Sequence, residues 1–398
     1  MHRIPHLPIG RRTALLGLTA TITLGRTALA LASPLTEQRL VVVLLRGALD
    51  GLAAVQPYGE PALADLRAPL TLPEPGHDGG LLDLGGFHGL HPALAGLHSL
   101  YRANELAIIH AAAGPYRSRS HFDAQDYLES GTDHRMTSGW LNRAAALLPA
   151  RPGGAETALS VGTSVGLILR GPAPVGTWLP QGFAQPDPAL YRALAALHAP
   201  DAITGPALKT GLAERGFTEA VLNGADPPRD KYSFPALALA AGKLLAAAQG
   251  PRIAALEIGG WDTHAAQRAR LQGTLTTLDR GLLALKEGLA AAWSRTAILV
   301  MTEFGRTVRA NGTNGTDHGT GSIALLAGGA IQGGRILGTW PGLAPAQLLD
   351  NRDLAPTTDL RSLAKTLLAS HLKIPAKHLP AIFPASTDTP PMPGLLRP

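Results

Sequence analysis

The sequence has no cysteine among its 398 residues, which excludes disulfides, thiolate metal sites and a cysteine nucleophile. A chain without disulfides must rely on the size of its core for stability. The composition allows a large core, because 45% of the residues are hydrophobic and only 16% are charged. This balance also excludes a disordered or fibrous protein. At this length, α/β proteins often form a single domain.

The first 32 residues contain the three parts of a twin-arginine export signal. Arg11–Arg12 precede a mildly apolar stretch, Thr13–Leu24, and small residues with an A-x-A pattern follow. The stretch is too short and too rich in threonine to span a membrane. A disordered basic terminus is the alternative. We expect the twin-arginine export machinery to recognise residues 1–32, which leaves a mature chain in the periplasm or outside the cell, without a stable membrane span.

The mature chain lacks a strong excess of positive charge. Lys and Arg number 35 against 29 Asp and Glu, and the first 32 residues contain four arginines and no acid. Removal of that segment therefore takes four charges from the net +6 and leaves +2. No basic run, and no stripe of aromatic and basic residues, remains. Nucleic acid is therefore not an expected partner.

Continuous apolar runs predict strands that are buried on both faces. They are Leu40–Leu45, Leu106–Ala112, Ile253–Ile258, Ala297–Met301 and Ile323–Ala327. Longer segments with helical apolar periodicity lie between and after them, at 237–248, 268–293 and 360–371. Strands that alternate with helices indicate βαβ units. We therefore expect a three-layer αβα fold with a mainly parallel sheet, built as one domain over 33–398 with irregular excursions and a proline-rich tail from about residue 375.

Carboxylate, imidazole and hydroxyl groups follow four of these predicted strands. In the order of the strands they are Asp50, Ser120, Asp262 with His264, and Glu303. In open parallel sheets, ligands bind beyond the carboxyl ends of the strands. We therefore expect these side chains to converge at one edge of the sheet.

Asp262 and His264 form the sharpest pair. In an extended segment, residues two apart point to the same side, so the pair presents one oxygen and one nitrogen to a common point. That combination suits a divalent metal. The alternative is a turn-capping aspartate beside a surface histidine. The preceding Gly259–Gly260 favours a ligand site, because glycines let the backbone approach closely.

The glycine-rich loop after the fourth strand carries further candidates. Glu303 is poorly explained as a solvated residue, because it follows a wholly apolar strand. Arg306 pairs with that carboxylate or grips an anionic substrate with its planar guanidinium. Asp317 and His318 either both bind metal, or Asp317 orients the imidazole from behind. An Asx turn in a glycine loop is the alternative for this last pair.

Ser120 and Asp123 have the S-x-x-D pattern of a helix start, which predicts an N-cap and a capping box. A serine at a helix N-terminus also lies in positive potential, where a nucleophile and a transferred anion are both stabilised. Arg119 and His121 are expected to bind the anion or to support the ligands from behind. Asp50 would complete the oxygen ligands, or is simply an acid in a tight turn.

Several motifs in order resemble the exported bacterial family catalogued as the domain of unknown function 1501. They are Arg11–Arg12, VVVLLRGALDG, RSHFDAQDYLESG, GGWDTH, TEFGRT, and GTDHGTGS followed by LLAGG. That family is similar, more remotely, to the alkaline phosphatase and sulfatase superfamily, in which strand-end Asp, Glu and His residues bind one or two divalent metals around a hydroxyl or formylglycine nucleophile. The resemblance implies an alkaline phosphatase-like fold, Ser120 as nucleophile, and as metal ligands Asp50, Asp262, His264, Glu303 and His318.

This chain departs from the superfamily at several points. The phosphatases space the Asp and His of one metal site more widely than Asp262 and His264. They also often have Asp-His where this chain has Glu303-Phe304, so one nitrogen ligand is missing. An ordinary sulfatase is not expected, because the segment similar to C-x-P-x-R begins with Ala113, which cannot become formylglycine.

The expected function is the hydrolysis of phosphate or sulfate esters by an exported, metal-dependent enzyme. Zn, Mn, Mg and Ca all remain open as the cofactor, and the expected partner is a small anionic ester. Ser120 or a water molecule would attack the ester, while Arg306 or Arg119 would hold the anion. The alternative is a non-catalytic exported protein that keeps the fold for binding or structure.

Overall fold

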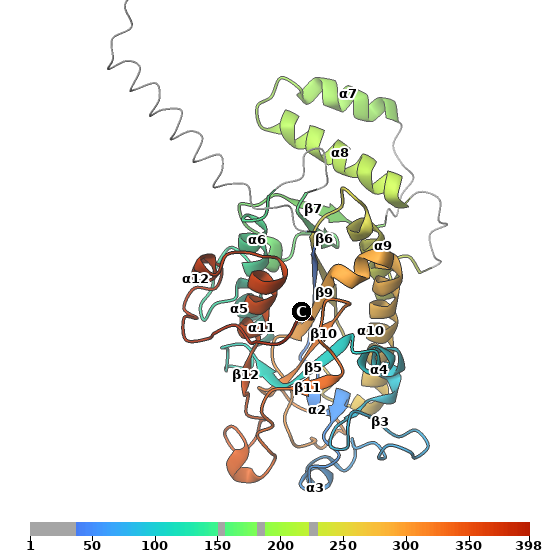
Figure 1. The fold of residues 1–398 in the computed structure, drawn as a ribbon, viewed down its shortest axis with the longest axis vertical. Coiled ribbons are helices and arrows are strands. Elements are labelled where there is room, and N and C mark those ends of the chain that lie inside the picture. Colours follow the sequence, from blue (N-terminus) through green and yellow to red (C-terminus); the bar gives the residue numbers. More distant parts are fainter. Residues whose placement is uncertain (1–36, 150–155, 181–187, 223–229) are drawn as a thin grey trace, which may run out of the picture. The chain divides into compact units, whose positions relative to one another are not determined.

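The computed structural model describes residues 37–149, 156–180, 188–222 and 230–398, so the predicted export signal lies outside the described residues. Strands and helices alternate along the chain (Figure 1). The strands are β1 (Arg39–Leu45), β2 (Val55–Gln56), β3 (Leu82–Asp83), β4 (Gly89–Leu90), β5 (Leu106–Ala113), β6 (Ala158–Val161), β7 (Val175–Trp178), β8 (Ile253–Ile258), β9 (Thr296–Thr302), β10 (Ser322–Ala327), β11 (Arg335–Leu337) and β12 (Thr358–Asp359).

The α-helices range from single turns to the long α10. They are α2 (Gly51–Ala54), α3 (Leu63–Arg67), α4 (Ala95–Arg102), α5 (His121–Ser130), α6 (Trp140–Ala145), α7 (Pro188–His198), α8 (Thr204–Leu222), α9 (Phe234–Ala246), α10 (Gln267–Leu289), α11 (Leu360–Thr366) and α12 (Leu379–Ile382). Short 3-10 helices occupy Pro92–Leu94, Leu167–Leu169, Ala290–Arg295, Pro345–Gln347 and Ala376–His378, and a π-helix occupies Leu367–His371.

The main sheet of the described residues has the order β11-β5-β10-β9-β1-β8-β6-β7, with β12 paired to β5. Its neighbours pair in parallel except at β10, which runs antiparallel to both β5 and β9. Strands β1, β5, β8 and β9 therefore run in the same direction, and their carboxyl ends meet at one edge. A smaller antiparallel sheet has the order β2-β4-β3. The predicted mainly parallel sheet is confirmed.

Helices cover both faces of the main sheet (Figure 1). The odd-numbered residues from Val41 to Leu45 on β1 pack in a core with residues of α4, α9 and α10. The even-numbered residues from Leu40 to Leu44 pack in a second core with residues of α6, α11 and α12. A strand buried on both faces must be apolar at every position, as the RLVVVLL sequence of β1 nearly is. The predicted three-layer αβα class is confirmed.

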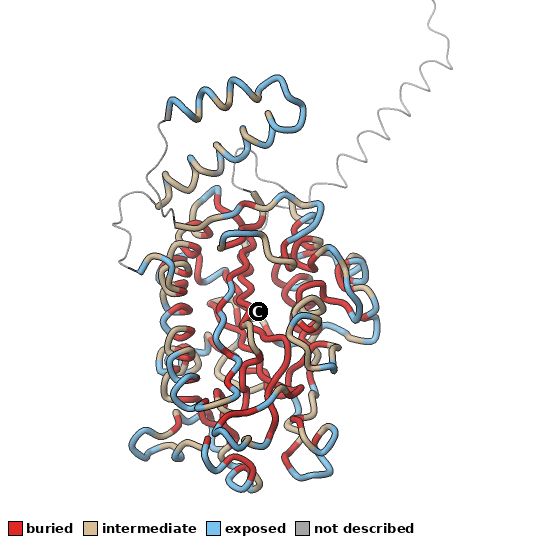
Figure 2. Tube along the Cα trace, turned by 180° about the vertical axis from the view of Figure 1, so that it is seen from behind, coloured by how far each residue is buried: buried red, intermediate tan, exposed pale blue. Residues whose placement is uncertain are grey.

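Helix α10 shows why the covering helices stay on the sheet. Its buried leucines recur at alternate intervals of four and three residues, which places them on one face of the helix: Leu271, Leu275, Leu278, Leu282, Leu285 and Leu289. Burial of each such side chain contributes about 1.5–3 kcal/mol. In Figure 2 the buried chain runs through the sheet and along the inward sides of the helices, whereas the exposed chain lies outside them.

The structure adds elements that the apolar pattern does not mark. Strands β6 and β7 extend the sheet beyond β8, and α7 and α8 pack against each other before α9. The proline-rich tail contains α12 and buries Phe383 and Leu395. Within the described residues, no helix combines the length and the apolar character needed to cross a bilayer.

Candidate metal centre

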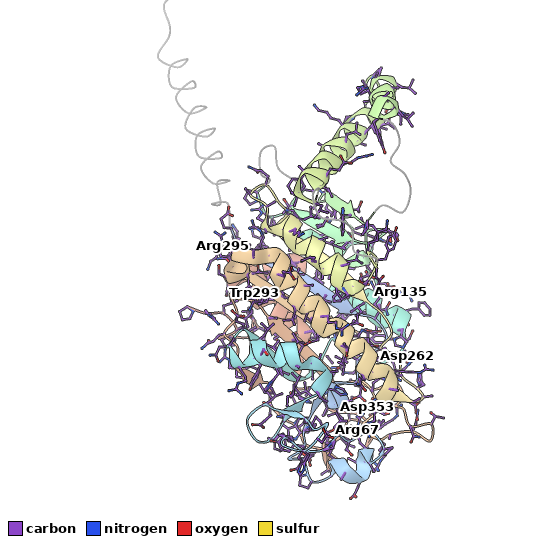
Figure 3. All side chains as sticks on the ribbon, turned by 90° about the vertical axis from the view of Figure 1, so that its right-hand side faces the viewer. Arg67, Arg135, Asp262, Trp293, Arg295 and Asp353 are labelled. Carbon is purple, nitrogen blue, oxygen red and sulfur yellow. The ribbon has the colours of Figure 1, made fainter. Side chains whose placement is uncertain are left out.

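The polar segments identified in the sequence do meet at the carboxyl edge of the main sheet. Asp262 follows β8, Glu303 follows β9, and His121 begins the helix that follows β5. Because β10 runs antiparallel to β9, the residues that precede it, including His318, also lie at this edge. Figure 3 shows Asp262 toward the opposite end of the sheet from Arg295, the residue immediately before β9.

Three imidazoles and one carboxylate form the centre of this edge. The Nε2 atom of His318 lies 3.0 Å from Nε2 of His121 and 3.1 Å from Nε2 of His264. Oδ1 of Asp262 lies 3.0 Å from Nε2 of His264 and 3.3 Å from Nε2 of His318, and Oδ2 lies 3.7 Å from Nε2 of His121. Ligand atoms of His121, Asp262 and His318 all lie within 4.8 Å of one another.

An acceptor behind each imidazole fixes which nitrogen carries the proton. Nδ1 of His121 lies 2.8 Å from the Glu303 carboxylate. Nδ1 of His264 lies 3.1 Å from the Asp317 carboxylate, and Nδ1 of His318 lies 3.0 Å from the backbone carbonyl of Arg119. Since these oxygens only accept hydrogen bonds, each Nδ1 must donate. In the neutral form of each imidazole, Nε2 then presents its lone pair to the centre, as metal-binding histidines do.

The arrangement fits a cation. Lone pairs and a carboxylate at these separations repel one another unless positive charge lies among them. Burial lowers the pKa of His318, and the neighbouring His121 and Arg306 add to the shift, which favours the neutral imidazole. Zinc–nitrogen bonds of about 2.0–2.1 Å in a tetrahedral site place ligand atoms roughly 3.3 Å apart. The observed separations are close to that value.

Glu303 lies behind His121 and not among the groups that face the centre, which differs from the metal-ligand role predicted for it. Its carboxylate accepts hydrogen bonds from Gly47 N–H at 2.8 Å, from the Gln125 amide at 3.1 Å and from the Thr302 hydroxyl at 2.9 Å, in addition to His121. Burial alone would raise its pKa, but the hydrogen bond from His121 and those from its other partners leave the pKa of Glu303 lowered.

Phe304, the residue after Glu303, packs against two imidazoles of the centre. Its ring stacks on the imidazole of His121, with centroids 4.8 Å apart, and lies 5.2 Å from the ring of His318. Phe304 therefore supports two imidazoles instead of adding a nitrogen. A nitrogen reaches the centre instead from His121, which follows a different strand, β5.

Arg306 holds Asp262 in place. Its Nη1 donates to Oδ1 of Asp262 at 2.6 Å, and its other nitrogens donate to the hydroxyl and the carbonyl of Thr316. Burial by itself would raise the pKa of Asp262, but the hydrogen bond and charge of Arg306 outweigh it, so the pKa is lowered. The Arg306 side chain is buried and bonded to the protein, which differs from the predicted grip on a substrate anion.

The glycines of the loop at 302–322 are required by close packing of backbones. A Cβ atom on Gly315 would lie 2.2 Å from the carbonyl oxygen of His264, and one on Gly319 would lie 2.3 Å from the carbonyl carbon of Arg306. Both distances are too short for any side chain. The glycines thus let the loop press His318 and Asp317 against the segment that carries His264.

Arg119 is also bonded within the protein. Its guanidinium lies 2.7 Å from Asp353 and 3.3 Å from Asp350. Of the two predicted roles, these contacts favour support of a ligand from behind over anion binding. The backbone of Arg119 has a φ of 62°, which is uncommon outside glycine. This conformation, held by the ion pairs, places the carbonyl that orients His318. Backbone strain of this kind concentrates at functional sites.

Ser120 occupies the N-cap position of α5, as the sequence predicts, but its side chain makes no capping hydrogen bond to the helix backbone. The neighbouring Asp123 has a lowered pKa, mainly through the hydrogen bond from Arg135, with smaller contributions from Tyr116 and Ser120. The serine hydroxyl therefore lies at the helix N-terminus, directly before His121, without the predicted capping bond.

Asp50 is separate from the group that faces the centre. Its buried carboxylate pairs with Arg67, accepts a hydrogen bond from the Gln267 amide at 2.5 Å and caps α2 through Ala53 N–H. A carboxylate with these partners serves as the counter-ion of a buried arginine. The sequence analysis predicted a metal ligand here. An acid that follows a strand looks the same in the sequence whether it binds a metal or pairs with a buried arginine.

His121 is the residue whose part the sequence analysis underestimated. Spacing could have indicated it, because His121 and Gln125 lie one helical turn apart and both reach Glu303. Gln125 also accepts a hydrogen bond from Arg46 at 2.9 Å, and Arg46 pairs with Glu129 at 2.9 Å. These contacts fix α5, and with it His121, to the end of β1.

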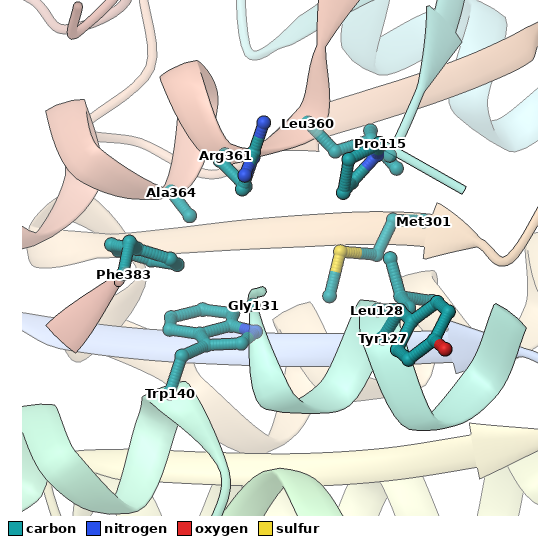
Figure 4. A pocket seen from close by; sticks show the side chains of 11 residues that line it. Pro115, Tyr127, Leu128, Gly131, Trp140, Met301, Leu360, Arg361, Ala364 and Phe383 are labelled. Atoms are coloured by element: carbon teal, nitrogen blue, oxygen red, sulfur yellow. The ribbon is translucent and has the colours of Figure 1, made fainter. Parts of the chain in front are cut away.

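An apolar hollow lies close to this edge, between α5, α6, α11 and β9 (Figure 4). Met301, Trp140 and Phe383 are among the residues that line it, and its volume is about 20 Å³. That volume holds about one water molecule. The hollow is therefore too small for a ligand larger than water. The imidazoles are open to the surface, where His264 and Asp317 are both about half exposed.

Comparison with solved structures returns several proteins at low identity. The phosphonate monoester hydrolase of Agrobacterium radiobacter is 11% identical, with a TM-score of 0.33, over 75% of this chain and 70% of that chain. The C-terminal periplasmic domain of EcEptC from Escherichia coli, in complex with Zn, is 8% identical, with a TM-score of 0.32, over 74% of this chain and 73% of that chain. A mutant of TAB5 alkaline phosphatase with Mg bound is 11% identical, with a TM-score of 0.28, over 73% of this chain and 91% of that chain.

Similarities at this level do not identify an activity. No curated protein matches the chain. The sequence model of one family, described as "Protein of unknown function (DUF1501)", matches residues 108–383, which include His121, Asp262, His264 and His318. This protein belongs to that family.

Proposed function

We propose that this protein is an exported metal-dependent hydrolase of phosphate or sulfate esters. Its metal centre would comprise His121, Asp262, His264 and His318. One observation carries the proposal: ligand atoms of His121, Asp262 and His318 lie within 4.8 Å of one another, and Nε2 of His264 adjoins them, 3.1 Å from Nε2 of His318. The Nδ1 of each imidazole donates to an acceptor behind it. The lone pairs and the carboxylate repel one another, and a cation bound among them would remove this repulsion.

The ligand set favours one transition-metal ion of the zinc type. Imidazole nitrogens suit Zn, Cu, Fe and Ni, whereas Mg and Ca prefer sites made entirely of oxygen. A set of three imidazoles and one carboxylate is therefore a poor site for Mg or Ca. Catalytic zinc commonly has three protein ligands and one position left for substrate. His121, Asp262 and His318 would be those ligands, and His264 would lie next to the fourth position.

A bound ion of this kind would polarise an ester oxygen and offset the charge that builds up on the transferred group. Ser120, at the N-terminus of α5 and next to His121, is the proposed nucleophile. Its Oγ would form a bond to phosphorus or sulfur as the bond to the ester oxygen breaks, and the departing alcohol would take up the hydroxyl proton. Water would then cleave the serine ester, which releases the acid and restores Ser120.

The chain's own contribution to anion binding would come from α5. Ser120 lies at its N-terminus, and the N–H groups of a helix's first turn favour negative charge there. Arg306 and Arg119, the two cations expected to hold the anion, are bonded to Asp262 and to Asp353 instead. They would act by fixing the carboxylate and the carbonyl that shape the centre.

The convergence of imidazoles and a carboxylate also supports a second candidate, a non-catalytic exported protein that binds a metal ion. With both arginines paired to carboxylates, neither offers a free guanidinium for a substrate anion. A screen of the purified mature protein separates the two candidates. After loading with Zn²⁺, Mn²⁺ or Mg²⁺, the enzyme hypothesis predicts turnover of 4-nitrophenyl phosphate or 4-nitrophenyl sulfate that is highest with Zn²⁺ and lost in His318→Ala. Metal binding without turnover of any phosphate or sulfate ester would favour the second candidate.

A further inference from the structure

Gln267, the first residue of α10, links the loops at three strand ends although it faces no imidazole of the centre. The side chain is buried. Its Nε2 donates to Asp50, which follows β1, at 2.5 Å. Its Oε1 accepts hydrogen bonds from the hydroxyl of Thr263, which follows β8, at 2.9 Å and from that of Thr316, which precedes β10, at 2.6 Å. One amide thus connects segments that are far apart in the sequence, since Asp50 and Gln267 are separated by 217 positions.

The partners of this amide define its orientation. A carboxylate can only accept, so the nitrogen must face Asp50, and the oxygen receives both hydroxyl protons. No charged side chain meets both needs: a glutamate would place a second carboxylate against Asp50, and a lysine has no acceptor. The position therefore requires a neutral group that donates on one side and accepts on the other.

From Gln267 the hydrogen bonds continue to the metal centre. Because the Thr316 hydroxyl donates to Gln267, its oxygen is left to accept from Nε of Arg306 at 3.2 Å. Arg306 in turn donates to Oδ1 of Asp262 at 2.6 Å. Thr316 also bonds through its backbone N–H to the carbonyl of Thr263 at 3.2 Å, one residue before His264. The guanidinium and the two ligand-bearing loops thus share one buried anchor.

We infer that Gln267 is a positioning residue of the metal centre, which holds Arg306, and through it Asp262 and the loop of His318, in the geometry that binds the ion. This inference rests on the proposed function, because it assumes that the centre binds a metal ion. The part that concerns the positions of Arg306, Asp262 and His318 applies to the metal-free protein as well. Partners behind metal ligands typically change metal affinity by about 10–100-fold when they are removed.

The test uses Gln267→Met in the full mature chain, which keeps the side-chain volume and removes the three hydrogen bonds of the amide. Asn142→Leu is the matched control. Asn142 is a buried amide that donates to the carbonyls of Leu169 and Ala173 at 2.8 and 2.9 Å, and within the described residues it makes no hydrogen bond to the metal centre. Both variants lose a buried amide of similar size, so a merely structural role predicts equal effects. Thr316→Val interrupts the same path one residue further on and replaces Gln267→Met if that variant does not fold.

Two readouts decide the inference. In the metal-free protein, long-range ¹H–¹⁵N correlation spectra of the imidazoles should show fixed tautomers for His264 and His318 in the parent and in Asn142→Leu. In Gln267→Met the same signals should move toward the values of exchanging tautomers. In a chelator competition with Co²⁺, affinity should fall at least about 10-fold in Gln267→Met and remain near the parent value in Asn142→Leu.

Parent-like imidazole spectra in folded Gln267→Met would overturn the inference, as would equal losses of Co²⁺ affinity in both variants. A parent protein that binds no Co²⁺, Zn²⁺ or Mn²⁺ would overturn the proposed function instead. In that case the imidazole spectra still decide whether Gln267 positions the two histidines.

Discussion

The Nδ1 atom of His121 donates to Oε1 of Glu303 at a distance of 2.8 Å. The two residues are 182 positions apart in the sequence, and they come from the ends of two strands, β5 and β9, that do not pair with each other. The carboxylate is nearly fully buried and bonded to Gly47, Gln125 and Thr302 as well. A carboxylate behind a histidine fixes its ring and raises its basicity as a metal ligand.

Glu303→Gln tests this relationship. The amide is isosteric and can still accept a hydrogen bond from His121, so the fold should persist, but the negative charge that supports the imidazole is lost. Metal affinity measured by chelator competition should fall about 10–100-fold. Glu287→Gln, at an exposed position on α10, is the control and should leave the affinity unchanged. Complete loss of the ion would instead mark Glu303 as a ligand, as the sequence analysis predicted.

Asp50→Asn should act on stability more than on metal stoichiometry. It removes the counter-ion of buried Arg67, and breaking a buried ion pair by removing one partner costs about 3–5 kcal/mol. The free energy of unfolding, measured with denaturant in the presence of a chelator, should fall by that amount. An Asp50→Asn protein of parental stability that can no longer bind metal would show that Asp50 is a ligand.

His264→Ala and Ser120→Ala separate metal binding from chemistry. The first removes a nitrogen that faces Asp262, so metal content and ester hydrolysis should fall together while the large core keeps the fold. The second should retain the ion and lose turnover. Since Ser120 makes no capping bond, its replacement should change stability by only about 0.5 kcal/mol or less. Full hydrolysis by both variants would place the chemistry elsewhere.

Stability should fall on acidification because of histidines remote from the centre. Burial lowers the pKa of His110 to about 3 and that of His371 to about 4. Unfolded histidine has a pKa near 6.5. Between pH 6.5 and 4 the unfolded chain therefore binds more protons than the folded one, so stability decreases as pH falls, by about 1.4 kcal/mol per pH unit for each such histidine.

Chelator-treated protein and its His371→Gln variant provide the measurement. Nε2 of His371 lies 2.8 Å from the backbone carbonyl of Arg39, which a glutamine amide can also reach as donor. Denaturant unfolding at pH 7 and pH 5 should show a smaller acid loss in His371→Gln than in the parent. The control is His77→Gln, at an exposed position, which should keep the full acid loss. Equal pH dependence in all three proteins would contradict the assignment.

Export remains a prediction from the sequence. Replacement of Arg11–Arg12 by Lys-Lys should leave unprocessed protein in the cytoplasm, because the twin-arginine machinery reads the arginine pair. Cell fractionation with detection of the mature and precursor forms measures this. Normal delivery of the mature chain to the periplasm would rule out a twin-arginine signal at 1–32.

The fold could be predicted from the sequence wherever burial is complete. Strands β1, β5, β8, β9 and β10 are apolar at almost every position, so their runs mark them within about one or two residues. Strands β6 and β7, with four residues each, are too short to leave a pattern. Helices α7 and α8 were not predicted. Much of their surface is exposed, and in α8 the apolar residues do not gather on one face.

The sequence could predict where the site lies but not which role each of its residues has. Strand-end chemistry located Asp262, His264 and His318 correctly at one edge, because parallel strands bring their carboxyl ends together. It could not tell a metal ligand from a carboxylate such as Glu303 that bonds an imidazole. That distinction depends on which partner lies opposite, and the partner, His121, comes from a distant part of the chain. The ion pair of Asp50 with Arg67 was hidden for the same reason.

The central claim is that one metal ion lies among these imidazoles, and anomalous diffraction from crystals of the zinc-loaded mature protein tests it most directly. The account predicts one strong peak at the zinc edge, about 2.0–2.1 Å from Nε2 of His121 and of His318 and from the Asp262 carboxylate, with His264 adjoining. A peak bonded to Asp50 or Glu303 in place of His121, or no peak at this edge of the sheet, would contradict it.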